Sequence, residues 1–224
     1  MAEAKLYYFD GRGLGEKVRI MLCAGGIQFE EVLMTERSQM EKLLQDGSLM
    51  FNQLPMLEID GLKLVQGNAM ARYVARRAGL YSDDPKIQAR LDMLYDGTRD
   101  FLAIFVVPLL TLTEEEVKQK VQDVNLPKFM PIYEKILRES GTGYLVGDKV
   151  SFADVGLLEV LLSVEDYIGE EAFKDYPLLR EYLAKMKSLD GIKVYLEKYR
   201  KRKNDERYRV EVQTVLAMVL EMIG

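Results

Sequence analysis

The chain has 224 residues, of which 48% are hydrophobic, and a formal net charge of −5. This composition allows one or two domains with a sizeable core; it argues against a nucleic acid partner and, without an apolar run of about 20 residues, against a membrane span. The chain has no histidine and one cysteine, Cys23, which excludes histidine catalysis, an internal disulfide and nearly every zinc site. Acid–base chemistry must therefore come from Tyr, Asp, Glu or Lys, or from a bound cofactor.

Strand and helix patterns alternate in the first 80 residues. The expected elements, in chain order, are a strand at 5–9, a helix at 15–24, a strand at 27–34, a helix at 36–44, strands at 55–59 and 62–65, and a helix at 68–77. A right-handed crossover makes the first two strands parallel. Asp60-Gly61 between two short apolar runs predicts a hairpin, so the last two strands are expected to be antiparallel.

Only helical patterns follow residue 85. Asp84-Pro85 predicts a helix start with proline at the first helical position. The expected helices are 86–110, 114–138, 152–168, 177–188 and 207–222. These patterns divide the chain into an α/β domain at 1–81 and an all-helical domain at 85–224.

Three local features refine the helical part. Ser151 to Asp154 has the form of a capping box, with Val150 and Val155 placed as a hydrophobic staple. Pro108 and Pro131 are expected to kink or end their helices. The basic run at 198–203 is interpreted as a solvated linker rather than a nucleic acid patch.

Several motifs together resemble the cytosolic glutathione S-transferases, most closely the alpha class. These motifs are the first-strand segment Tyr7–Gly13, the segment Leu49–Gly61, the segment Tyr144–Lys149 and the box at Ser151. The resemblance runs from about residue 5 to the C-terminus. It implies a thioredoxin-like domain of β-α-β-α-β-β-α order that binds glutathione, followed by an all-helical bundle with an electrophile pocket and a C-terminal lid helix.

The implied chemistry needs one hydrogen-bond donor aimed at sulfur. The thiol of glutathione ionises above neutral pH, and a donor that favours the thiolate lowers its pKa. By resemblance that donor is the hydroxyl of Tyr8. Tyr7 beside it is a built-in control, because successive side chains of a strand point to opposite faces. The alternative is that Tyr8 is simply a β-forming aromatic residue.

Other residues match positions that hold the tripeptide. The resemblance places Leu54, before a cis Pro55, against the cysteinyl part of glutathione as an added strand. The remaining glutathione-binding residues that it implies are Gln53, Gln66, Gly67, Asp100 (toward the neighbouring subunit) and Lys128. The backbone N–H groups at Gly67 would meet the γ-glutamyl carboxylate. Lys128 is equally well explained as a solvated surface residue.

The sequence departs from the alpha-class pattern at three places. Leu14 and Leu44 stand where basic residues are expected, and Gly67-Asn68 replaces a hydroxyl residue followed by arginine. Each lost charge-assisted contact weakens binding by about 1.5–3 kcal/mol if nothing compensates for it. Arg12 is a candidate to compensate for the first loss, and Lys42 or Gln45 for the second. Glutathione capture is therefore expected to be poorer than in an ordinary member.

The resemblance also implies a second substrate site and a homodimer. An apolar pocket for a small electrophile is expected between the domains, lined by Phe9, Val106, Leu110, Val215, Leu216, Val219 and Leu220. The last four are equally well explained as helix core. Phe51 matches the aromatic key that inserts into the partner subunit. The alternative for Phe51 is burial under its own loop.

Two functions stay open at this level. The first is a cytoplasmic detoxification enzyme that conjugates glutathione to apolar electrophiles, with peroxidase or isomerase side activity and no metal. The second is a non-catalytic scaffold that carries apolar ligands or has a structural role, which Leu14, Leu44 and Gly67 favour. Conjugation measured for the wild type and Tyr8→Phe separates the two. The electrophile itself depends on pocket shape, which sequence patterns do not supply.

Overall fold

The computed structural model describes residues 3–105, 112–201, 210, 212–214 and 217. These residues form two compact units, the first from the described parts of 1–74 and 194–224, and the second from those of 75–193. The change of unit at 74–75 lies near the expected end of the α/β domain, but the C-terminal segment groups with the first unit. The limits 1–81 and 85–224 stay a prediction about the folding domains.

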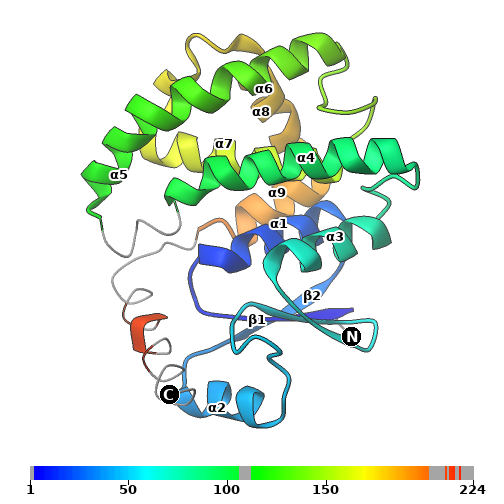
Figure 1. Cartoon of the computed structure of the whole chain (residues 1–224), viewed down its shortest axis with the longest axis vertical. Coiled ribbons are helices and arrows are strands. Elements are labelled where there is room, and N and C mark those ends of the chain that lie inside the picture. The colour runs from blue at the N-terminus through cyan, green and yellow to red at the C-terminus, as the bar shows by residue number, and fades with distance from the viewer. Residues whose placement is uncertain (1–2, 106–111, 202–209, 211, 215–216, 218–224) are drawn as a thin grey trace. The chain divides into compact units, whose positions relative to one another are not determined.

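A four-stranded sheet forms the centre of the first unit (Figure 1). Its strands are β1 (Ala4–Tyr8), β2 (Phe29–Leu33), β3 (Met56–Ile59) and β4 (Leu62–Val65), in the order β2-β1-β3-β4. β1 pairs with β2 in parallel, and β3 pairs with both β1 and β4 in antiparallel fashion. Asp60 and Gly61 both have positive φ angles, as a tight hairpin turn requires. The expected parallel pairing of the first two strands and the antiparallel hairpin of the last two are confirmed.

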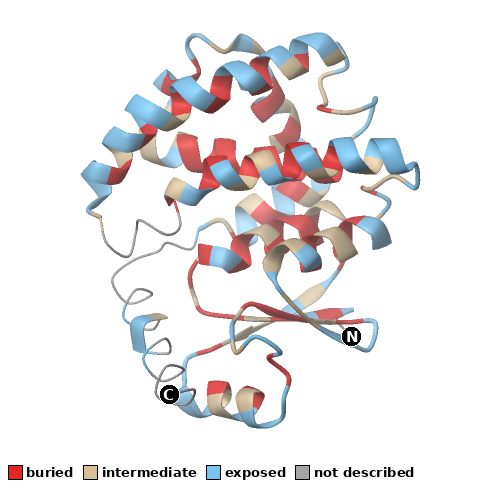
Figure 2. Cartoon of the chain, viewed as in Figure 1, coloured by how far each residue is buried: buried red, intermediate tan, exposed pale blue. Residues whose placement is uncertain are grey.

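Helices cover both faces of this sheet. They are α1 (Glu16–Ala24), which follows the short 3₁₀ turn η1 (Gly13–Gly15), α2 (Arg37–Gln45) and α3 (Gly67–Arg77). α1 and α3 lie on one face and α2 lies on the other (Figure 1). The buried side of α1, which includes Val18 and Leu22, packs into the core (Figure 2). The observed order is the β-α-β-α-β-β-α order expected from the sequence.

Residues after 190 form an element that the sequence patterns missed. α9 (Asp190–Lys198) is followed by Tyr199, which is buried and stacks on Phe29 with ring centroids 4.9 Å apart. Arg200 forms an ion pair with Glu16 at 3.4 Å. The interpretation of 198–203 as a solvated linker is therefore wrong at 199 and 200, because an aromatic ring and a buried glutamate hold these residues on the first unit.

The second unit is all-helical. Its elements are α4 (Pro85–Leu102), η2 (Ala103–Phe105), α5 (Glu114–Lys120), the π-helical turn η4 (Val121–Asn125), α6 (Leu126–Ser140), α7 (Phe152–Ile168), η5 (Glu170–Phe173) and α8 (Pro177–Lys187). α7 is buried along most of its length and packs on α4 and α8 (Figure 2). None of the helices in the described part of the chain is long and apolar enough to cross a membrane.

The local predictions for this unit have mixed outcomes. Asp84 caps α4 by accepting from two backbone N–H groups, as expected. The capping box at Ser151 and Asp154 is confirmed. Pro131 lies inside α6, which continues to Ser140, so of the two expected effects it does not end the helix, and a kink there stays a prediction. The single helix expected at 114–138 contains a π-helical turn. Pro108 and most of 207–222 lie outside the described residues.

Candidate active site

Tyr8 lies at the carboxyl end of β1, where the chain turns toward α1. Its side chain is buried, and its ring packs edge to face on Phe9 with centroids 5.4 Å apart. The backbone N–H of Leu14 donates to the Tyr8 hydroxyl oxygen at 2.9 Å. A hydroxyl group can accept one hydrogen bond and donate another, so this contact is compatible with a donor role for the Tyr8 O–H group. Gly15 permits the approach of α1, since a Cβ there would lie only 2.6 Å from Tyr8 Cδ1.

Tyr7 is committed to a different contact. Its hydroxyl donates to Glu58 Oε2 on β3 at 3.0 Å. Burial and the neighbouring Glu58 carboxylate raise the pKa of Tyr7 to about 12. Of the two adjacent tyrosines, Tyr8 is therefore the one whose hydroxyl oxygen is held by a backbone donor at the start of a helix.

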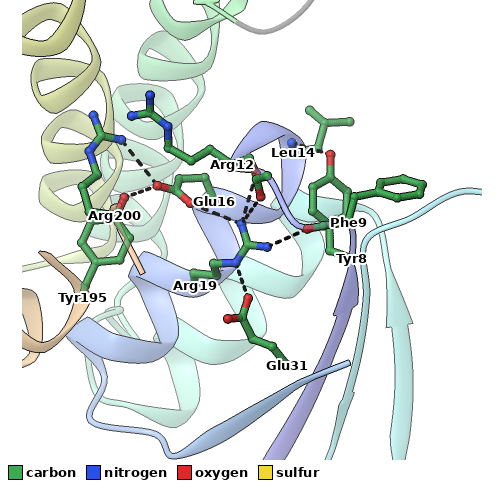
Figure 3. Close-up of polar contacts among 10 residues, drawn as sticks. Tyr8, Phe9, Arg12, Leu14, Glu16, Arg19, Glu31, Tyr195 and Arg200 are labelled. Atoms are coloured by element: carbon green, nitrogen blue, oxygen red, sulfur yellow. Dashed lines mark hydrogen bonds and ion pairs between the residues drawn. The ribbon is translucent and has the colours of Figure 1, made fainter. Parts of the chain in front are cut away.

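Arg19 holds the loop between β1 and α1 through hydrogen bonds to its backbone (Figure 3). The guanidinium is fully buried, and it donates to the carbonyl groups of Phe9 and Gly11. It also forms ion pairs with Glu16 and Glu31, and these carboxylates raise the pKa of Arg19 against the opposing effect of burial. Its Cζ lies 5.6 Å from the ring centroid of Tyr8. A fixed positive charge thus lies beside the phenol ring.

The carboxylate of Glu16 joins this loop to the C-terminal segment of the first unit. Glu16 is buried and accepts from the Tyr195 hydroxyl, from Arg19 and from Arg200 (Figure 3). A buried carboxylate with three donors resists displacement, because removal of a partner leaves a charge without compensation. The residues around Tyr8 are therefore held in place by two elements far apart in the sequence.

A pocket opens next to this loop in the first unit. It is lined by Leu14, Lys17, Gln53, Leu54, Pro55, Val65, Gln66, Gly67 and Asn68. The Leu54–Pro55 peptide bond is cis, as the resemblance implied, and Gln66 has a φ of 70° just before α3 begins. The structure thus brings the predicted residues Gln53, Leu54, Pro55, Gln66 and Gly67 together in one pocket.

The three departures from the family pattern have distinct structural settings. Leu14 is exposed, and its backbone N–H donates to the Tyr8 hydroxyl. Leu44 packs against the apolar cluster that contains Tyr8 and Phe9, which explains an apolar residue at that position. The side chain of Arg12 points away from the Tyr8 hydroxyl in Figure 3, so Arg12 does not take the place of a basic residue at 14.

Lys17 is a charged pocket residue that sequence reasoning missed. It lies on the first turn of α1, and its Nζ is 3.3 Å from Asn68 Oδ1 on α3. The available signal was indirect: a side chain is lost at Gly67 while a lysine is present on the helix that follows the first strand. Nothing in the spacing of these two segments shows that they meet.

Other predicted residues lie elsewhere. Asp100 and Lys128 belong to α4 and α6 of the second unit, and both are exposed. Phe9 is buried beside Tyr8, and Phe51 is 54% exposed, which argues against its burial under its own loop. The other expected pocket residues lie outside the described residues; they are Val106, Leu110, Val215, Leu216, Val219 and Leu220. Val212, which precedes Val215 by three residues in the sequence, packs on the cluster that contains Tyr8.

The chain's own thiol is not a candidate nucleophile. Cys23 is buried in α1, and burial raises its pKa to about 12, so the reactive thiolate is scarce at neutral pH. Within the described residues, no group of three or more Cys, Asp or Glu side chains could hold a metal ion. The site as described therefore consists of a buried phenol and a nearby pocket lined by both polar and apolar residues.

Comparisons with known proteins identify the same pattern over nearly the whole chain. Family models of the glutathione S-transferase N-terminal and C-terminal domains match residues 4–76 and 99–199. Glutathione S-transferase 3 of Gallus gallus is 41% identical over 99% of this chain and 98% of its own length. Glutathione S-transferase alpha-4 of Rattus norvegicus is 38% identical, over 95% of this chain and 97% of its own.

Solved structures agree. The glutathione S-transferase from Ascaris lumbricoides has a TM-score of 0.73 and 32% identity, over 88% of this chain and 97% of that chain. The monomeric Na-GST-3 from Necator americanus has a TM-score of 0.74 and 32% identity over the same shares. The fold and the family expected from the sequence motifs are confirmed, and the chain belongs to the glutathione S-transferase family.

Proposed function

We propose that this protein is a glutathione transferase in which the Tyr8 hydroxyl donates a hydrogen bond to the sulfur of bound glutathione. That bond favours the thiolate, which attacks an apolar electrophile and forms a thioether. In a substitution, the electron pair of the thiolate forms the carbon–sulfur bond and the leaving group departs with its own pair. The thiol proton passes to solvent when the thiolate forms.

The contact between Leu14 and Tyr8 is the observation that carries this proposal. A backbone donor at 2.9 Å fixes the hydroxyl oxygen and polarises its O–H bond, since linked hydrogen bonds strengthen one another. The Arg19 guanidinium, 5.6 Å from the ring centroid, favours negative charge nearby. The loss of a basic side chain at Leu14 is thereby compensated in part by a backbone group and by Arg19.

The pocket beside Tyr8 supplies the groups that a tripeptide needs. In our proposal, the backbone of Leu54 pairs with the cysteinyl part of glutathione, and Gln53 and Gln66 contact the peptide and its γ-glutamyl end. Leu54 and Pro55 both line the pocket, which supports this use of the Leu54 backbone. Gly67 begins an 11-residue helix, whose first N–H groups favour a carboxylate.

The electrophile is proposed to lie beside Phe9. Phe9 belongs to the apolar cluster around Tyr8, and Val212 packs on that cluster. An apolar substrate there would lie close to the sulfur. Peroxide reduction and isomerisation by bound glutathione stay predictions, as does a cytoplasmic location.

We also propose a homodimer in which Phe51 inserts into the partner subunit. The exposed fraction of Phe51 is 54%, and that of Met50 beside it is 77%. Two adjacent large apolar residues on a loop favour an interaction surface. Asp100 is proposed to reach the neighbouring subunit's glutathione, and Lys128 its glycyl end. Na-GST-3 of Necator americanus is described as monomeric, so the oligomeric state needs its own measurement.

Conjugation of glutathione to chlorodinitrobenzene tests the catalytic proposal. We expect Tyr8→Phe to lower kcat/KM by about 10- to 100-fold, the value of a charge-assisted hydrogen bond. Tyr7→Phe is the matched control, because the hydroxyl of Tyr7 is bonded to Glu58, and it should retain activity. If the wild-type protein shows neither conjugation activity nor thermal stabilisation by glutathione, the result would instead support the non-catalytic scaffold.

A further inference from the structure

Lys17 and the start of α3 pack closely together at one end of the pocket. The Lys17 Nζ lies 3.3 Å from Oδ1 of Asn68, the second residue of α3. The lysine methylene chain passes over Gly67, where an added Cβ would lie 2.8 Å from Lys17 Cδ and 3.3 Å from Cε. The apolar stem is therefore held by packing while the ammonium group stays at the pocket, a common arrangement for lysine.

The missing side chain at Gly67 and the presence of Lys17 belong to one arrangement. The family pattern has a hydroxyl residue at position 67, and the sequence alone shows only that this hydroxyl is absent. The structure shows that the space of such a side chain is occupied by the Lys17 stem. The site has thus lost a neutral hydroxyl donor and gained a cation with three N–H donors.

The charge of the pocket favours an anion at this end. Lys17 is the one cation among the described residues that line the pocket, and no acidic side chain is among them. The first N–H groups of α3 add partial positive charge at the same place. A carboxylate bound there would meet a full and a partial positive charge together.

We infer that Lys17 binds the α-carboxylate of the γ-glutamyl group of glutathione and replaces the hydroxyl contact expected at position 67. This inference rests on the proposed function and assigns a binding role to a residue outside the family motifs described above. The Oδ1 of Asn68, which accepts from Lys17, also orients the ammonium group toward the start of α3. The departure at Gly67 then exchanges one carboxylate ligand for another and does not remove the subsite.

Calorimetric titration of the full-length protein with two glutathione analogues tests the contact. One analogue has the γ-glutamyl α-carboxylate amidated, and the control analogue has the glycyl carboxylate esterified. We expect Lys17→Met to weaken glutathione binding about tenfold, as for loss of one charge-assisted contact, and Lys17→Arg to retain most of the affinity. The amidated analogue should bind wild type and Lys17→Met about equally, whereas the esterified analogue should still distinguish them.

A reciprocal exchange tests the link to Gly67. In wild type, Gly67→Ser should displace the Lys17 stem and weaken binding, whereas in a Lys17→Ala background the same substitution should strengthen it, because the space is open and a hydroxyl returns. Unchanged affinity in Lys17→Met, or equal losses for glutathione and its amidated analogue, would overturn the role of Lys17 while Tyr8-dependent conjugation persisted. Wild type that fails to bind glutathione would overturn the proposed function as well.

Discussion

Gly15 keeps the first turn of α1 clear of the Tyr8 ring, and we predict that Gly15→Ala displaces the catalytic hydroxyl. The backbone at Gly15 is right-handed helical, with φ −73° and ψ −22°, so alanine is conformationally acceptable there. Its Cβ, however, would lie 2.6 Å from Tyr8 Cδ1 and 2.9 Å from Cγ. Ordinary contact begins at 3.4 Å, so the ring and the helix must separate by about 0.8 Å.

This displacement sets the expected loss of activity. The hydroxyl lies farther from the Tyr8 Cα than Cδ1 does, so a pivoting ring moves the oxygen by at least as much. A misplacement of about 1 Å in an active site costs about 10²-fold in rate. Two opposing effects act on the free energy of unfolding. Alanine in place of glycine stabilises the fold by about 0.4–1 kcal/mol because it lowers the entropy of the unfolded chain, whereas overpacking costs about 1–3 kcal/mol. The net loss is about 1 kcal/mol.

Steady-state conjugation and thermal unfolding of Gly15→Ala check both expectations. The control is the same substitution in a Tyr8→Phe background, where the hydroxyl is already absent and Gly15→Ala should add little further loss. Full activity in Gly15→Ala with raised thermal stability would refute the placement of the Tyr8 ring against α1.

Three further predictions concern stability, pH and assembly. Asp154→Ala leaves three buried donors without their acceptor, whereas the Tyr182 hydroxyl keeps the backbone carbonyl of residue 154. The variant should lower the free energy of unfolding by about 4 kcal/mol, measured by urea titration. The exposed Asp148→Ala is the control, and equal effects would contradict the role of the capping box. The raised pKa of Tyr7, about 12, means that folding favours its neutral form, so Tyr7 contributes to stability below pH 10 and this contribution is lost as the pH rises toward 12. Unfolding titrations over this range should show a steeper loss of stability for wild type than for Tyr7→Phe. Parallel curves would count against the Glu58 contact. Phe51→Glu should convert the mass in solution from that of two chains to that of one, measured by sedimentation; an unchanged dimer would exclude Phe51 as the key.

Local chemistry made much of the fold predictable from sequence. The Asp60-Gly61 turn and the box at Ser151 and Asp154 depend on neighbours within a few residues, and both are present in the structure. Tyr8 could be proposed because the family motif places it at the sulfur, and because side-chain alternation lets only one of the two tyrosines face the site. These signals survive because short-range hydrogen bonds and side-chain alternation are properties of the segment itself.

Contacts between distant segments were not predictable in the same way. The run after Lys198 reads as a polar linker, yet Tyr199 and Arg200 are held by Phe29 and Glu16 from the first unit. The basic run is visible in the sequence, but its contact with the buried carboxylate of Glu16, more than 180 residues earlier in the chain, is not. Tertiary partners therefore decided the structure of this segment.

The pocket shows the same limit on sequence reasoning. Gly67 reads as the loss of a ligand when its segment is considered alone. Only the position of Lys17 against Gly67 and Asn68 shows what occupies that space. Similarly, Leu44 reads as a missing cation, whereas its packing on the apolar cluster explains why it is apolar.

The pKa of the thiol of bound glutathione tests the central claim most directly. It is measured by ultraviolet titration of the thiolate in the complex, in wild type, Tyr8→Phe and the Tyr7→Phe control. We predict that the pKa lies below that of free glutathione in wild type and Tyr7→Phe, and returns toward the free value in Tyr8→Phe. A lowered pKa that persists unchanged in Tyr8→Phe would contradict the role of this hydroxyl in forming the thiolate.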